Sequence, residues 1–152
     1  MSKSKWEIKE LNNDIPFGES SKIILSNRLN NLLNSIEVFF KEDTEENLHD
    51  IRIALRRLRY NMELFIVCFD SKKFLSFYKK IEHLQDQSGL LRDLDVLKVN
   101  INSLIIKEKL KISNRMFKKI EEKRNELKAS LKLELMKFNH SKALKNFISL
   151  LS

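Results

Sequence analysis

Glycine and proline, the residues that most readily end helices, are scarce in this chain. Two Gly and one Pro occur in 152 residues, which is too few for the tight turns of a sheet protein. Hydrophobic residues make up 42% of the chain and charged residues 33%, a mixture that favours amphipathic helices. The sequence therefore predicts an all-α protein, an antiparallel bundle of about five to six helices.

The chain has room for one domain with a proper core. Residues 1–18 are expected to form an N-terminal tail that contains Trp6, because Pro16 cannot continue a helix. Residues 19–152 are expected to form a single bundle. Its helices are expected over 19–41, 48–69, 71–87, 90–109 and 113–138, with a final segment over 141–151. Gly89 is expected to end the third helix.

The chain carries a formal charge of +8. Such a charge favours an anionic partner, whether nucleic acid, polyphosphate or a membrane surface, without choosing among them. No signal-peptide pattern begins the chain, and no apolar run is long enough to cross a membrane. The single cysteine, Cys68, suits a reducing compartment. A cytoplasmic location and no membrane partner are therefore expected.

One stretch, Leu48 to Phe69, has the clearest helical period in the chain. Thr44 stands before it as an N-cap, with Asn47 three residues on. At about 100° per residue, its apolar residues fall on one side. The opposite side carries the basic row, which we define as His49, Arg52, Arg56 and Arg59. Arg57 falls at the flank of this row.

Arginines stacked along one helix face repel each other by a few tenths of a kcal/mol per pair. The row therefore makes sense if an anion comes to it, and the planar guanidinium suits phosphate oxygens. Arg28, at the edge of the apolar face of the first helix, is a candidate for the same anion. The residues alone leave a second interpretation equally open, a solvated basic face that pairs with acids of a neighbouring helix.

The stretch HDIRIALRRLRYNMELF, which starts at His49, resembles the signature helix of the CHAD family, the conserved histidine α-helical domain. The later stretch GLLRDLDVL, which starts at Gly89, is similar to the second family motif, LGxxRDLDVL. Ser88 stands where the family usually has Leu. The resemblance is clear from about Leu48 to Leu97, and weaker outside.

This resemblance implies a domain that binds inorganic polyphosphate through basic residues, without catalysis or cofactor. It also implies a protein of the cytoplasm or of polyphosphate granules. Family members usually hold two similar bundles, and this chain holds one repeat. Lysines and a histidine of the third helix, with one arginine of the second motif, are expected to line the approach. The candidate binding residues are His49, Arg52, Arg56, Arg57, Arg59, Lys72, Lys79, Lys80, His83 and Arg92.

One charge is expected inside the bundle. Arg124 lies in the middle of the apolar stripe of the helix over 113–138, and an unpaired buried charge is very costly. Asp93 and Asp95 are its expected partners. These two acids are therefore interpreted as structural, supporting Arg124 or the arginines of the basic row.

Three alternatives compete with polyphosphate binding. The sequence His49-Asp50-Ile51-Arg52 resembles the HELR core of histidine-kinase phosphorylation helices, so phosphotransfer through His49 is one alternative. However, no proline follows, and phosphotransfer domains usually have Lys and then Gly where Arg52 and Ile53 stand. No protease, hydrolase or phosphate-loop motif occurs, so no enzyme is expected.

A metal site is not expected either. Its histidines, His49, His83 and His140, are spread over three helices, and the arginines beside His49 would repel a cation. Nucleic acid is the stronger competitor for the basic row. It ranks second because the row lacks the Asn, Gln or aromatic residues that read or stack bases, apart from Tyr60 at its margin.

A homodimer is also expected, because two single bundles related by a two-fold axis could rebuild a shared basic cleft. The apolar residues of the final segment are the candidates for its contact. They are Leu144, Phe147, Ile148, Leu150 and Leu151. The alternative is that this segment folds back on its own bundle.

Overall fold

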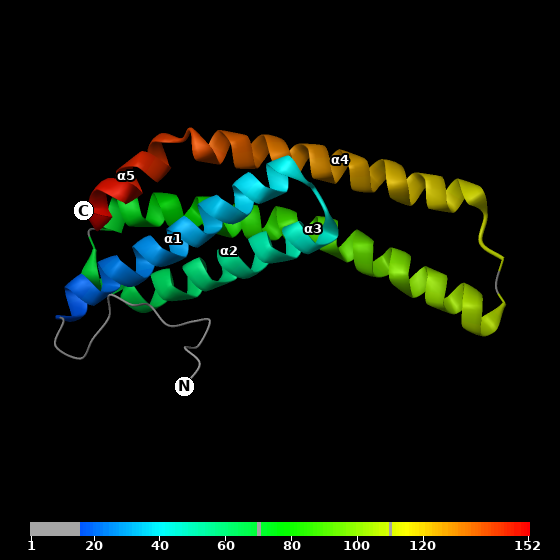
Figure 1. Ribbon diagram of the computed structural model, residues 1–152, viewed down its shortest axis with the longest axis horizontal. Helices are drawn as coiled ribbons and strands as arrows, with labels where there is room; N and C mark the ends of the chain where they lie inside the picture. Colours follow the sequence, from blue (N-terminus) through cyan, green and yellow to red (C-terminus); the bar gives the residue numbers. More distant parts are fainter. Residues whose placement is uncertain (1–15, 70, 110) are drawn as a thin grey trace.

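The computed structural model describes residues 16–69, 71–109 and 111–152. Within these ranges the chain is all-α, and its helices pack as a bundle without strands (Figure 1). This confirms the predicted fold class. The helices are α1 (Phe17–Lys41), α2 (Glu45–Phe65), the short 3-10 helix η1 (Ile66–Cys68), α3 (Ser71–Glu108), α4 (Asn114–Asn139) and α5 (Lys142–Leu151).

The first two helices form a hairpin closed by a three-residue connection. Thr44 caps α2, because its hydroxyl accepts a hydrogen bond from the Asn47 backbone N–H at 3.1 Å. This is the predicted cap, and the acids Glu45 and Glu46 in the first turn favour the positive end of the helix dipole. At the open end of the hairpin, α1 begins at Phe17, whereas the sequence predicts a tail that extends to residue 18. Trp6 of the predicted tail lies outside the described residues.

The third helix differs from the prediction. Gly89 does not end it, and no new helix starts at Leu90, because α3 continues unbroken from Ser71 to Glu108. Gly89 has an ordinary negative φ, and a lone glycine costs a helix only about 1 kcal/mol relative to alanine. The good helix formers around it are enough to carry the helix through.

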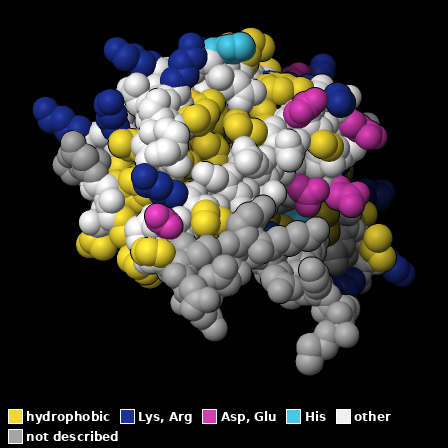
Figure 2. Space-filling model, turned by 60° about the vertical axis from the view of Figure 1, so that its left-hand side comes forward, with side chains coloured by type: hydrophobic (Ala, Val, Ile, Leu, Met, Phe, Trp, Pro, Cys, Tyr) yellow, Lys and Arg dark blue, Asp and Glu magenta, His cyan; other side chains and the backbone are white. Residues whose placement is uncertain are grey.

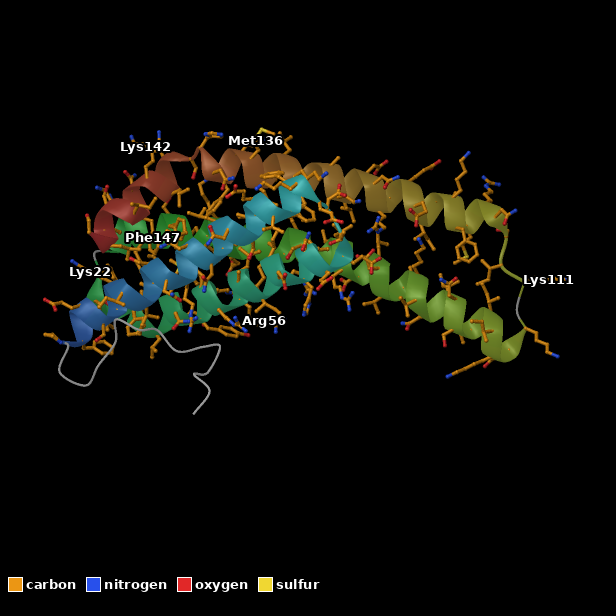
Figure 3. All side chains as sticks on the ribbon, in the orientation of Figure 1. Lys22, Arg56, Lys111, Met136, Lys142 and Phe147 are labelled. Carbon is orange, nitrogen blue, oxygen red and sulfur yellow. The ribbon has the colours of Figure 1, made fainter. Side chains whose placement is uncertain are left out.

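Aromatic rings fill the centre of the bundle. Phe77 of α3 stacks on Phe147 of α5 with ring centroids 4.0 Å apart, and Phe74 lies 5.9 Å from the same ring. Figure 3 shows Phe147 on α5, the helix that folds back over the end of the bundle. Leu144 is buried in the same core.

The final segment therefore has little apolar surface to spare. Leu144 and Phe147 are buried, and Leu150 and Leu151 pack against the core. Of the five residues predicted to make a dimer contact, Ile148 alone is exposed. The structure thus favours the alternative, in which the segment covers its own bundle, and the homodimer itself stays a prediction.

The second half of α3 and the first half of α4 extend past the ends of α1 and α2 as a two-helix arm (Figure 1). Two sets of ion pairs mark the place where the arm leaves the bundle. Asp43, in the connection between α1 and α2, binds Lys132 and lies 3.6 Å from Lys128, both on α4. Arg124 of α4 donates to Asp95 of α3 at 2.6 Å and lies 3.9 Å from Glu45.

Candidate functional site

The outer surface of α2 presents the basic row to solvent. The helix buries one side against α1 and α3, so residues about 180° away from that side must face outward. His49 and Arg56 are exposed there, while Arg52 and Arg59 are half-buried along the α3 side. Figure 3 shows Arg56 on α2, away from the other helices.

Arg52 lies at the centre of a basic cluster between α2 and α3. Burial lowers the pKa of Arg52 first, and the nearby charges of Arg56 and Arg92 lower it further. Its Nε is buried and has no hydrogen-bond partner among the described residues. The charge of Asp93 acts on the pKa of Arg52 in the opposite direction. We call Arg52, Arg56 and Arg92 the arginine cluster.

Arg59, by contrast, is held by acids and polar groups. Its Nη2 lies 3.2 Å from Glu82 of α3, and its Nη1 donates to Gln85 at 3.2 Å. Its Nε donates to the Tyr78 hydroxyl at 3.1 Å, and that hydroxyl donates to Glu63 at 2.6 Å. The hydrogen bond with Tyr78, and then the two acids, raise the pKa of Arg59. For this residue the structure matches the second interpretation of the basic row, pairing with acids of a neighbouring helix.

Arg57 lies on the other flank of α2, towards α1. Burial lowers the pKa of Arg57, and the charge of Arg28 on α1 adds to this effect. The Nε of Arg28 is buried without a hydrogen-bond partner among the described residues. The structure therefore brings Arg28 and Arg57 together, as a pair of cations beside the basic row.

Lys79, Lys80 and His83 lie beside α4 instead. They line a cavity of about 300 Å³ together with Leu84 and three residues of α4, which are Glu134, Lys137 and Phe138. The Nε2 of His83 lies 3.9 Å from Glu134. Lys80 and Glu82, the partner of Arg59, are separated by about 200° around α3. The predicted residues of α3 thus divide between two surfaces, and Lys72 is exposed near the start of the helix.

Sequence reasoning missed Lys137 and Glu134 as neighbours of His83. The helical period of α4 places both residues on one flank of its apolar stripe. The period does not reveal, however, which side of α3 packs against that flank.

Sequence reasoning identified the partner of Arg124 correctly. Asp95 pairs with Arg124, whereas Asp93 is exposed and acts on Arg52. Asp95 therefore has the structural role predicted for the pair, and the same role for Asp93 stays a prediction.

The charge on the surface is uneven. On the face shown in Figure 2, Lys and Arg side chains gather mainly at the upper left, whereas Asp and Glu gather mainly on the right. Among the described residues, no group of three or more His, Cys, Asp or Glu side chains could hold a metal ion. Within the same part of the chain, no helix is long and apolar enough to cross a membrane. The guanidinium groups of the arginine cluster can attract an anion.

The comparisons with known proteins give one match. The family model described as CHAD domain matches residues 4–102. This range contains α1, α2, and α3 as far as residue 102, and with them the whole arginine cluster. No curated protein and no solved structure matches the chain.

Proposed function

Because this chain belongs to the CHAD domain family, we propose that it binds inorganic polyphosphate on the outer surface of α2, without catalysing a reaction. The observation that carries the proposal is the arginine cluster. Arg52, Arg56 and Arg92 come from two helices, and no ion pair with an acid satisfies any of them among the described residues. Three cations held together in this way gain most from an anion with closely spaced charges.

A phosphate polymer fits the cluster for a physical reason. Burial and mutual repulsion both disfavour the charged form of Arg52, and a bound phosphate chain would relieve the repulsion at several arginines at once. The guanidinium presents a fork that matches phosphate oxygens and stays charged at ordinary pH. Arg52 and Arg92 are also partly buried, so water and salt screen their contacts with an anion less than they would at a fully exposed site.

The remaining candidates have graded roles in this proposal. His49 is exposed at the outer edge of the row, and Arg57 adds charge from the α1 side. Arg59 contributes at longer range, since Glu63 and Glu82 already occupy it. Four cationic candidates of α3 lie on a neighbouring surface rather than at the cluster. In this proposal they attract a part of the polyphosphate chain that extends beyond the cluster. They are Lys72, Lys79, Lys80 and His83.

Titration of inorganic polyphosphate against duplex DNA of matched charge tests the proposal. We expect polyphosphate to bind more tightly, with an affinity that falls steeply as salt rises, because counterions are released. We expect each single replacement of Arg52, Arg56 or Arg92 by Gln to weaken polyphosphate binding by about tenfold. This is the affinity that one charge-assisted hydrogen bond contributes. The matched control is Arg115→Gln, which removes the same charge from an exposed residue of α4 near the far end of the arm.

Three results would contradict the proposal. Equal affinity for the two polymers would make the site a general polyanion surface and favour nucleic acid as the competitor. An effect of Arg115→Gln as large as that of Arg56→Gln would show that net charge, rather than the cluster, governs binding. Unchanged binding in all three cluster variants would show that polyphosphate binds at another site.

We also propose a location in the cytoplasm or on polyphosphate granules, which labelling the protein in cells would test.

Phosphotransfer through His49 is a second candidate, favoured by the exposure of this side chain on α2. It would place an acid-labile phosphate on His49, and His49→Gln would abolish labelling. Under polyphosphate binding, His49→Gln should weaken the interaction only modestly, because the arginines dominate. Incubation with a phosphodonor, followed by acid treatment, separates the two functions.

A further inference from the structure

The arm carries an apolar row that the described chain covers only in part. We define the arm as residues 90–108 of α3 and 114–128 of α4. Its base adjoins α2, where Arg92 lies near Arg52 and Arg124 lies near Glu45, and the rest extends past α1 and α2 (Figure 1). Leu90, Leu97 and Leu104 recur every seven residues on one side of α3, and their side chains are 54%, 42% and 45% exposed. Helices with such a seven-residue apolar repeat usually pack against another helix.

The two helices of the arm are already joined to each other. Asp95 pairs with Arg124, Lys98 binds Glu121, and Ile101 and Ile120 are buried. These contacts place α4 against one side of α3 and leave the leucine row beside that contact. Met116 of α4 is also exposed. The arm therefore needs no partner to hold its helices together, but it keeps a row of half-exposed leucines in water, which is unfavourable.

A second row runs beside the leucines and carries opposite charges at its two ends. Asp93, Asn100 and Lys107 also recur every seven residues, and all three are exposed. The positions are symmetric about Asn100. If two copies of α3 lie antiparallel with Asn100 at the centre, Asp93 of each copy comes opposite Lys107 of the other. Leu97 of each copy then lies close to Leu104 of the other copy along the same contact.

We propose that the arms of two copies of this chain pair in this antiparallel manner and form a homodimer. The charge pattern is the reason for choosing a second copy as the partner. A two-fold contact requires that each residue and its partner exchange roles across the axis, and the row from Asp93 to Lys107 satisfies this requirement by itself. Opposite charges beside an apolar seam set the pairing partner and the direction of helices. The inference does not depend on the function proposed for the arginine cluster.

Analytical ultracentrifugation at micromolar to tens of micromolar protein tests the dimer. We expect a dimer for the unchanged chain and a monomer for Leu97→Glu, with the same helix content by circular dichroism. The matched control is Val99→Glu. Val99 is 63% exposed on the same arm, but lies about 160° round the helix from Leu97, so its variant should stay dimeric. A strict monomer for the unchanged chain, or equal effects of the two substitutions, would overturn the proposal.

Charge exchange tests the direction of pairing. Asp93→Lys or Lys107→Asp alone places like charges opposite each other, so each should weaken the dimer by about fivefold to tenfold, as rim charges do. The combined variant Asp93→Lys with Lys107→Asp restores opposite charges and should recover the original dissociation constant. Additive weakening in the combined variant would contradict the antiparallel pairing.

Crosslinking tests the position of the axis. In a Cys68→Ser background, Asn100→Cys places its thiol next to the same thiol of the second copy at the two-fold axis, so mild oxidation should give a disulfide-linked dimer. The matched control is Asn102→Cys, because Asn102 is also exposed on the arm but lies about 160° round α3 from Asn100. This control should not crosslink. Efficient crosslinking at residue 102 with none at residue 100 would overturn the proposed axis.

Discussion

At the scale of single residues, the pair of Asp95 and Arg124 shows what a helical period can reveal. Arg124 stands in an apolar stripe, so it requires a partner, and the second motif supplies the carboxylate. The Asp95 side chain is 1% exposed and bonds to the Arg124 guanidinium at 2.6 Å. This hydrogen bond is the largest of the causes that raise the pKa of Arg124.

Removing this carboxylate should be costly. Asp95→Ala leaves a partly buried guanidinium whose remaining acidic neighbours, Glu45 and Glu121, act at longer range, so the free energy of unfolding should fall by about 3 kcal/mol. Urea denaturation measures the difference. Asp93→Ala, at the exposed neighbour in the same motif, is the control and should change stability little. Equal losses in the two variants would show that the ion pair contributes nothing special.

Arg59 shows the limit of the same reasoning. The period of α2 places it correctly with Arg52 and Arg56, and Glu63 is visible in the same sector. Its capture by Glu82 and Tyr78 is not visible in the sequence, because these residues lie on α3. The rotation of one helix about its own axis relative to another depends on packing across the core, which no local pattern records. For the same reason, the sequence groups the lysines and histidine of α3 with a surface from which the structure separates them.

At the scale of elements, the cap of α2 is more predictable than the length of α3. Thr44 caps α2 as expected, since an N-cap depends on residues within one turn. The predicted break at Gly89 is wrong, because continuation of a helix depends on the sum of many residues and on tertiary contacts on both sides of the glycine. Leu91 and Leu84 are both buried, so the core holds α3 on either side of this position.

The continuity of α3 makes Gly89 a site where stability can be gained. A Cβ built there would meet no atom within 4 Å, and alanine loses less backbone entropy than glycine in a helix. Gly89→Ala should therefore raise the free energy of unfolding by about 0.5 to 1 kcal/mol, measured by urea denaturation. Gly18→Ala, in the first turn of α1, should give a smaller gain. A destabilised Gly89→Ala protein would mean that this part of α3 needs to bend.

At the scale of the whole molecule, the all-α bundle follows from the sequence because composition and period act everywhere along the chain. The arm does not follow, although its helices do. The length of the arm is the distance by which α3 and α4 extend beyond the ends of α1 and α2. It depends on where the α1–α2 connection lies along α3 and α4. Asp43 fixes that place by binding Lys132 and lying close to Lys128.

This junction should make the molecule sensitive to acid. The hydrogen bond with Lys132 lowers the pKa of Asp43, and the one with Lys98 lowers the pKa of Glu121. A carboxylate whose pKa is lower in the folded state stabilises that state fully above its unfolded pKa, about 4. This contribution is lost as the pH falls from there through the folded pKa. Thermal melting between about pH 6 and pH 2 should show the loss, and Asp43→Asn should make the acid decline shallower. An identical pH profile in that variant would contradict the assignment.

The unbroken course of α3 also sets a rule for changes in chain length. One inserted residue after Gly89 would turn the rest of α3 by about 100° and advance it by about 1.5 Å. Leu91 would then turn out of the core, Asp95 would face away from Arg124, and the leucines of the arm would point in a new direction. Seven inserted residues would restore the original phase to within about 20°. Along this helix, a deletion or insertion thus rotates the following side chains about the helix axis. The fold should therefore tolerate changes in the length of α3 by whole turns better than changes by single residues.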